Sequence, residues 1–269
     1  GLPGETLESF KDGLENMVGE SNIETIYIFP CIVLPNAPMN LPEYKEKYAI
    51  KTIHSPISLR HTSIQNETMD EFENLITNTS SFNFDDLKEM HVYSWAILTF
   101  QNLGIMQYVA KYYNQMYGLK FVDFYAEFLK YCRSKKSIFS EEYENLVEYM
   151  NIGYSGKGWN HFDSKIGDIN WPIEEASWLR LVSQKDTLSE DIYQFLINFD
   201  KTLGYNTSEE ILKDLTKLQV FLLSTFDKNE SKSENLKFNW KKFFINTEKV
   251  LEKEYGAYLL KNQVIESQY

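Results

Sequence analysis

The sequence is poor in the residues that build metal centres and tight turns. Its 269 residues include two cysteines and 12 glycines. Cys31 and Cys132 lie far apart, and neither belongs to a C-x-x-C or C-x-x-x-C-x-x-C cluster, so this sequence carries no zinc or iron–sulfur motif. A single disulfide between them stays open, but free thiols in a cytoplasmic protein are the better interpretation.

The chain also lacks a basic excess and a long apolar run. Its formal net charge of −12 and pI near 4.9 argue against non-specific binding to nucleic acid or to an anionic membrane. The one dense basic run, Arg133–Lys136, is typical of a solvated helix end. The longest apolar stretch, residues 23–38, is too short to span a bilayer. We therefore expect no nucleic-acid partner and no membrane insertion.

Aromatic residues are abundant, with 18 Tyr and 18 Phe. So many large rings with so few glycines favour helices packed through bulky side chains over a sheet sandwich with many tight turns. The sequence therefore predicts a mainly α fold, a helical domain with a small α/β element at its N-terminus.

Two regions differ in their hydrophobic pattern. Residues 1–62 predict a helix that follows Thr6 as N-cap, a strand at 23–34 buried on both faces, and a weaker strand at 50–59. Residues 63–269 predict a helical domain. Its helices are expected at 69–77, 85–101, 105–117, 120–132, 139–150, from 172 onward, 188–203, 207–225 and 243–253.

Residue types alone assemble no self-sufficient active site. The opening turn, Gly1–Thr6, could hold an anion at a helix N-terminus, but the carboxylate of Glu5 disfavours a phosphate, and a purely structural turn is favoured by spacing. The four histidines show no ligand spacing, and His91 falls on an apolar helix face as a packed histidine. Glu174 and Glu175 are best explained as first-turn acids of a helix.

The first part of the chain resembles a known family. GLPGETLESFKDGL followed by IYIFPCIVLPNAPM is similar to the second half of the radical S-adenosylmethionine (SAM) barrel, closest to its cobalamin-binding branch. HVYSWAILTFQNLG and INWPIEEASWLRLV resemble helices of the long C-terminal region found in those members. The resemblance implies that the chain corresponds to the C-terminal portion of such an Fe–S oxidoreductase or methyltransferase-like enzyme.

The resemblance also implies roles for individual residues. The glycines and the glutamate of the family motif match Gly1, Gly4 and Glu5, and Glu5 would orient the cofactor. The strand that flanks the cofactor adenine in the family matches the segment that holds Ile28 and Phe29. These five residues are the predicted cofactor-binding set, with no catalytic and no metal-binding residue.

The sequence departs from the family in lacking its three-cysteine motif, which binds a 4Fe–4S cluster. We therefore expect a chain that is not catalytic alone and that needs an upstream radical SAM domain and a cobalamin domain. SAM, the cluster and cobalamin would be cofactors of the full-length protein, with none bound by this chain alone. The substrate is unknown, and the strand at 23–34 could pair with a second copy of the chain through its exposed edge.

Two other functions remain open at the level of sequence. The chain could be a non-enzymatic, acidic, helical interaction module in which GLPGET is only a turn. It could also be a small-molecule binding domain that uses the glycine-rich stretch 153–167 as a lid.

Overall fold

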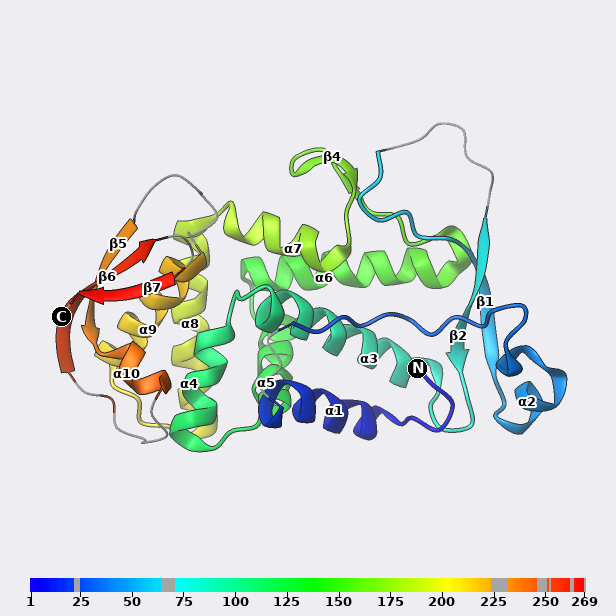
Figure 1. Ribbon diagram of the computed structural model, residues 1–269, viewed down its shortest axis with the longest axis horizontal. Coiled ribbons are helices and arrows are strands. Elements are labelled where there is room, and N and C mark those ends of the chain that lie inside the picture. The colour runs from blue at the N-terminus through cyan, green and yellow to red at the C-terminus, as the bar shows by residue number, and fades with distance from the viewer. Residues whose placement is uncertain are drawn as a thin grey trace. The chain divides into compact units, whose positions relative to one another are not determined.

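The computed structural model describes residues 1–21, 25–63, 71–223, 232–245, 251, 253–261 and 264–268. Helices dominate this part of the chain (Figure 1), which confirms the predicted mainly α class. The chain divides into two compact units, residues 1–99 with 141–180 and residues 100–140 with 181–269. These units are defined by contacts in space, so they do not test the domain boundary that the sequence predicts at residue 62. That boundary stays a prediction.

The first unit contains helices and two small antiparallel sheets, β1 with β2 and β3 with β4. Its α-helices are α1 (Leu7–Glu15), α2 (Pro42–Lys47), α3 (Phe84–Ala96) and most of α6 (Ile138–Ile152) and α7 (Ile173–Val182). Its shorter helical segments are η1 (Asn16–Glu20), η2 (Pro38–Asn40), the start of η3 (Ile97–Asn102) and η4 (Gly153–Lys157). Its strands are β1 (Lys51–Pro56), β2 (Phe72–Asn78), β3 (Phe162–Asp163) and β4 (Gly167–Asn170).

Helix α1 begins where the sequence predicts it. The Thr6 hydroxyl accepts a hydrogen bond from the Ser9 main-chain nitrogen at 3.1 Å, and the Ser9 hydroxyl accepts one from the Thr6 nitrogen at 2.8 Å. This reciprocal capping box satisfies two main-chain donors that the first helical turn would otherwise leave unpaired. The turn formed by residues 1–5 therefore leads directly into the capped start of α1.

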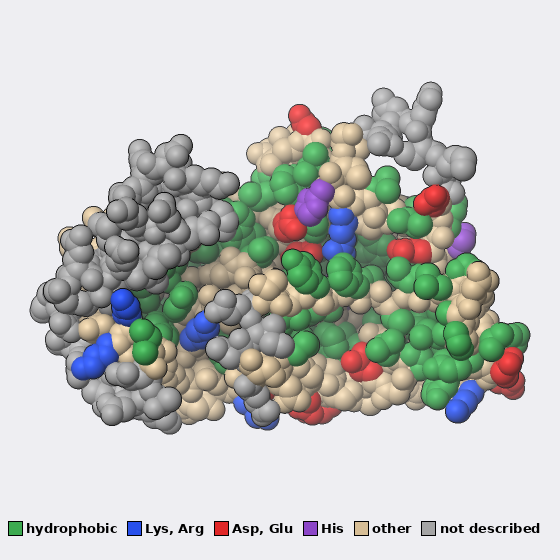
Figure 2. Space-filling model, viewed as in Figure 1, with side chains coloured by type: hydrophobic (Ala, Val, Ile, Leu, Met, Phe, Trp, Pro, Cys, Tyr) green, Lys and Arg blue, Asp and Glu red, His purple; other side chains and the backbone are tan. Residues whose placement is uncertain are grey.

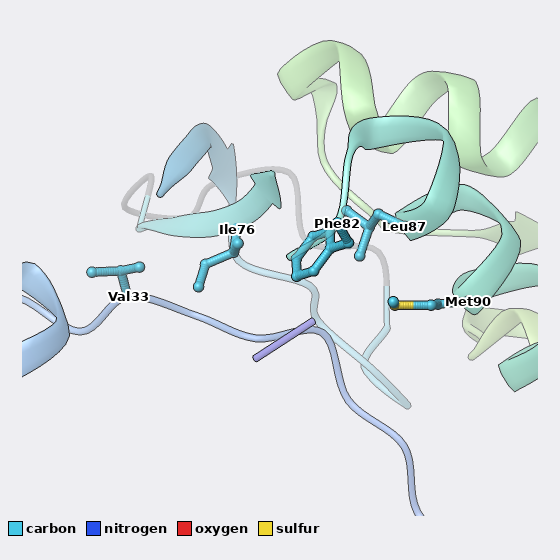
Figure 3. Packing of buried hydrophobic residues seen from close by; sticks show 5 residues of the cluster. All are labelled: Val33, Ile76, Phe82, Leu87 and Met90. Atoms are coloured by element: carbon cyan, nitrogen blue, oxygen red, sulfur yellow. The ribbon is translucent and has the colours of Figure 1, made fainter. Parts of the chain in front are cut away.

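A hydrophobic cluster joins the N-terminal segment to β2 and α3. Figure 3 shows its five buried members, Val33, Ile76, Phe82, Leu87 and Met90. Leu7 and Phe10 of α1 pack against this cluster, so one side of α1 is tied to the same core. Truncating any of the large members would remove buried apolar area, at a typical cost of about 2–5 kcal/mol.

The prediction that residues 23–34 form a strand buried on both faces is wrong. Residues 22–24 lie outside the described residues, and 25–34 form an extended segment with one isolated bridge, between Ile32 and Leu75 of β2. Tyr27, Phe29 and Leu34 are 76, 64 and 60% exposed. The apolar run is extended, but Ile26 and Val33 are buried in the core whereas Tyr27, Phe29 and Leu34 face solvent.

The predicted weaker strand is confirmed as β1, whereas the predicted helix at 69–77 is wrong. Residues 69–70 lie outside the described residues, and the remainder falls in β2, which pairs with β1 in antiparallel register. Phe72, Leu75 and Ile76 have helical spacing in the sequence, which caused the wrong prediction. Pairing with a partner distant in sequence decides the conformation instead.

The second unit is built from helices and a three-stranded antiparallel sheet in the order β5-β6-β7. Its α-helices are α4 (Gln107–Tyr117), α5 (Phe121–Ser134), α8 (Lys185–Leu203), α9 (Glu209–Leu223) and α10 (Trp240–Ile245). Its strands are β5 (Lys232–Phe238), β6 (Lys253–Lys261) and β7 (Val264–Gln268).

Rings fill the interior of the second unit, as the composition predicts. Phe128 packs against Phe100 and Phe195 with ring centroids 4.5 and 5.3 Å apart. The hydroxyl of the buried Tyr113 donates a short hydrogen bond to the buried carboxylate of Asp200. The predicted helix at 243–253 agrees with α10 over residues 243–245, whereas residues 246–250 and 252 lie outside the described residues. Its end is wrong, because Leu251 is not helical and β6 begins at Lys253.

Candidate functional site

One cavity of about 450 Å³ lies entirely within the first unit. Figure 2 shows one face of the molecule, where hydrophobic side chains gather over the elements of this unit with acidic and basic ones among them. The lining residues are Gly1, Leu2, Glu5, Phe10, Gly13, Leu14, Met17, Tyr27, Ile28, Phe29, Pro30, Cys31, Ser58, Arg60, Glu73, Leu87, Met90, His91, Ser94, Trp95, Leu98, Tyr149, Tyr154, Trp159, Ile173 and Glu174. A volume of this size is typical of sites for small molecules.

The opening turn forms one wall of the cavity. The main-chain nitrogen of Glu5 donates to the Leu2 carbonyl at 3.1 Å, which closes the turn. The Glu5 carboxylate accepts hydrogen bonds from the main-chain nitrogens of Gly1 and Leu2 at 3.0 and 3.3 Å. Gly4 has a φ of +95°, which a glycine adopts without strain. The turn therefore holds one oxygen of Glu5, Oε2, in a fixed place at the rim of the cavity.

The extended segment forms a second wall. Tyr27, Ile28, Phe29, Pro30 and Cys31 all line the cavity. The rings of Tyr27 and Phe29 are stacked, with centroids 6.4 Å apart and planes 8° from parallel. Burial raises the pKa of the Cys31 thiol, so it is a protonated, unreactive group at neutral pH. This wall is apolar and aromatic.

His91 of α3 lies deep in the cavity among aromatic rings. Its Nδ1 is 3.2 Å from the Tyr154 hydroxyl, and its ring stacks on Trp159 with centroids 5.3 Å apart. Burial lowers the pKa of His91 to about 4, with a further lowering from the charge of Arg60. His91 is therefore neutral at pH 7, and it is a hydrogen-bonding group rather than a charge.

The position of Trp159 depends on Gly153. A Cβ atom at residue 153 would lie 2.4 Å from the Trp159 ring, a distance that no side chain can tolerate. The Tyr149 hydroxyl donates to the Trp159 carbonyl at 2.9 Å, which holds the loop from the other side. The glycine at the start of η4 thus lets the loop carry an indole ring into the cavity wall.

Charged side chains also line the cavity, among them Arg60, Glu73 and Glu174. The Arg60 guanidinium is 3.6 Å from the Glu174 carboxylate and lies over the Phe29 ring, 5.4 Å from its centroid. Burial raises the pKa of Glu174, and a hydrogen bond from its own main-chain nitrogen and the charge of Arg60 only partly offset this effect. Burial also raises the pKa of Glu73, which Arg60 lowers in part. Each carboxylate therefore lies where its charged form is disfavoured.

The cavity brings together four of the five predicted cofactor-binding residues. Gly1, Glu5, Ile28 and Phe29 line it, whereas Gly4 does not and instead donates its main-chain N–H to the Ser81 hydroxyl at 3.0 Å. Their proposed role in binding a cofactor stays a prediction.

The remaining cavity residues were missed as a site. Glu174 and Glu175 do lie in the first turn of α7, as predicted, but Glu174 also lines the cavity while Glu175 pairs with His61 at 2.7 Å. His91 is packed against rings, as predicted, and it also lines the cavity.

Nothing in the part of the chain that the structure describes groups three or more His, Cys, Asp or Glu side chains as a metal site. Cys31 and Cys132 are both free thiols. Across the described segments, no helix has the length and apolar character needed to cross a bilayer.

Comparison with known proteins points in the same direction as the opening motif. The chain is 22% identical over 262 residues to the cobalamin-dependent radical SAM methyltransferase TokK of Streptomyces tokunonensis, which covers 91% of this chain. It is also 22% identical over 265 residues to a 2-(S-pantetheinyl)-carbapenam-3-carboxylate methyltransferase of Streptantibioticus cattleyicolor, which covers 92%. The chain spans 38% of the length of each of these relatives. No family model matches the chain.

Proposed function

We propose that this chain is the C-terminal part of a cobalamin-dependent radical SAM methyltransferase, where it forms one wall of the SAM site and part of the substrate surface. The observation that carries the proposal is that one cavity is lined by Gly1, Glu5, Ile28 and Phe29. The family resemblance marks all four of these residues. Similarity to TokK along 91% of the chain supports it independently.

The cavity residues fit the parts of SAM that they would contact. The Glu5 carboxylate, oriented by two main-chain donors, suits an amine or a ribose hydroxyl. Ile28 and Phe29 offer an apolar surface to a flat heterocycle such as adenine. When bound in the complete enzyme, SAM supplies the methyl group or the 5′-deoxyadenosyl radical for the reaction.

This chain's own contribution would be binding, orientation and exclusion of water. The aromatic wall of Tyr149, Tyr154 and Trp159 closes one side of the cavity with little polar surface, which lowers the local dielectric constant. The neutral His91 offers a hydrogen bond without adding charge.

The iron–sulfur cluster and cobalamin do not fit this chain's described residues. A cluster needs three converging thiolates, and the two cysteines fall in different units. Cobalamin is much larger than the ligands that a 450 Å³ cavity encloses. Both groups would be held by the remainder of the proposed enzyme, and we derive no step through either one.

The proposal is tested by SAM affinity in the complete protein. Glu5→Gln keeps the shape and one oxygen acceptor but removes the charge, so we expect SAM to bind about tenfold more weakly by calorimetry. Glu8→Gln, on α1 outside the cavity, is the matched control and should bind SAM as the unmodified protein does.

Two results would contradict the proposal. One is equal SAM affinity for both variants and the unmodified protein, and the other is no SAM binding to the complete protein. The second result would favour the alternative of a non-enzymatic interaction module.

A further inference from the structure

The charge of the cavity is unbalanced. The ionisable carboxylates among its lining residues are Glu5, Glu73 and Glu174, and the one basic side chain among them that is charged at pH 7 is Arg60. Glu5 is engaged by the main-chain nitrogens of its own turn. The other two carboxylates, together with Arg60, define what we call the acidic end of the cavity.

Glu73 is the less expected of the two. It lies on β2 two residues before Leu75, so the alternation of a strand puts it on the same face as that buried leucine. Among the described residues its carboxylate has no hydrogen bond or ion pair, and burial raises its pKa. The Glu73 carboxylate is half-buried and lines the cavity, so a cationic ligand there would offset part of its desolvation.

Glu174 has a partner, but an incomplete one. Its side chain is 17% exposed and lies 3.6 Å from the Arg60 guanidinium, longer than a charge-assisted hydrogen bond. The charge of Arg60 also offsets part of the rise that burial causes in the pKa of Glu73, and the guanidinium lies over the Phe29 ring. One guanidinium is therefore the counter-charge of two carboxylates. One negative charge at this end stays without compensation from the described cavity residues.

Aromatic side chains line the same cavity as these carboxylates. The Tyr149 and Trp159 rings pack edge to face, with centroids 5.3 Å apart. Burial and the charge of Glu174 raise the pKa of the Tyr149 hydroxyl, whereas the charge of Arg60 lowers it. Phe29 already carries a cation over its face in the form of Arg60. Carboxylates together with aromatic faces are the combination that recognises organic cations.

We propose that the acidic end of the cavity binds the ammonium group of an organic amine substrate, with Glu73 and Glu174 as its counter-charges and the aromatic wall against its apolar part. Calling this ligand the substrate rests on the proposed function, whereas its charge class rests on the cavity alone. An anionic ligand would instead have to displace Glu174 from Arg60 and would meet the negative charge of Glu73 in the same cavity.

Three probes of equal size and different charge test this inference. Phenethylammonium is a cation, 2-phenylethanol is neutral and phenylacetate is an anion. Binding to the complete protein is measured by calorimetry, with and without saturating SAM. We expect phenethylammonium to bind at least tenfold more tightly than either of the others, and to do so also with SAM present.

The variants Glu73→Gln and Glu174→Gln should each weaken phenethylammonium binding by about tenfold and leave 2-phenylethanol binding unchanged. Glu175→Gln is the matched control, because it removes a charge at the neighbouring position where the side chain faces His61 outside the cavity. It should bind all three probes as the unmodified protein does.

Several outcomes would overturn the inference. Tighter binding of phenylacetate, absence of discrimination among the probes, and absence of binding by all three each contradict a cation site. Loss of phenethylammonium binding when SAM is added would assign the acidic end to SAM instead. A cation preference in a protein that binds no SAM would refute the proposed function and leave this inference standing.

Discussion

The contact between Gly153 and Trp159 predicts the effect of a single added methyl group. In Gly153→Ala the new Cβ would meet three atoms of the Trp159 ring at 2.4–2.5 Å. The ring cannot rotate away at low cost, because it packs against His91, Tyr149 and Tyr154 with centroids 4.8–5.3 Å apart. The loop or the indole must therefore shift.

The size of the effect follows from two opposing terms. Overpacking a well-packed interior costs about 1–3 kcal/mol. Alanine is favoured over glycine in helical conformation by about 1 kcal/mol, which offsets part of that cost at the start of η4. We expect Gly153→Ala to lower the free energy of unfolding by up to about 2 kcal/mol, measured by urea denaturation, and to weaken binding of phenethylammonium.

Gly13→Ala is the matched control. Gly13 lies in α1, also lines the cavity, and has no atom within 4 Å of an added Cβ. This substitution should raise the free energy of unfolding by about 0.5–1 kcal/mol through helix propensity alone. If the two substitutions change stability by the same amount, the close contact between residue 153 and the indole does not exist.

Three further predictions concern single polar groups. Glu142→Gln removes one of two carboxylate partners of the half-buried Arg180, which donates to both Glu142 oxygens at 2.7 Å and to Asp163 at 3.2 Å. It should lower the free energy of unfolding by about 2 kcal/mol in urea denaturation, whereas Lys213→Gln in an exposed pair should leave it unchanged. Asp214→Asn loses an acceptor for the main-chain nitrogens of β5, so hydrogen exchange should show reduced protection there and an unfolding free energy lower by about 2 kcal/mol. Burial lowers the pKa of His91 to about 4 in the folded state, so the folded protein binds fewer protons there than the unfolded chain. The free energy of unfolding should therefore fall by up to about 3 kcal/mol as the pH drops from 6.5 to 4. His91→Gln should flatten this pH dependence. Equal losses of stability in Lys213→Gln and Glu142→Gln would refute the first prediction. Unchanged hydrogen exchange of β5 in Asp214→Asn would refute the second, and an unaltered pH dependence of stability in His91→Gln would refute the third.

The sequence predicts the helices well because their signals are local. The capping box at Thr6 and the left-handed Gly118 after α4 both mark helix boundaries within one turn. Strands depend on partners elsewhere in the chain, and β2 was missed because the spacing of Phe72, Leu75 and Ile76 also fits a helix. The strands β6 and β7 were missed as well.

The site was only half visible in the sequence. The family resemblance identified Glu5 in GLPGETLESFKDGL and the segment around Phe29 in IYIFPCIVLPNAPM, because each lies in a short contiguous pattern. Glu73, His91 and Trp159 come from β2, α3 and the loop after η4, and only the fold brings them to one cavity. A carboxylate at Glu73, two residues before a buried leucine, is the one local signal that could have drawn attention to this end.

Light-driven labelling with an azido-adenine analogue of SAM tests the central claim most directly. The complete protein is irradiated with the analogue, digested and mapped by mass spectrometry, with excess unlabelled SAM as competitor. We expect labelling of the extended segment 25–34, which contains Ile28 and Phe29, and we expect unlabelled SAM to suppress it. Labelling that spares this segment, or that maps only to residues of the second unit, would contradict the proposed SAM site.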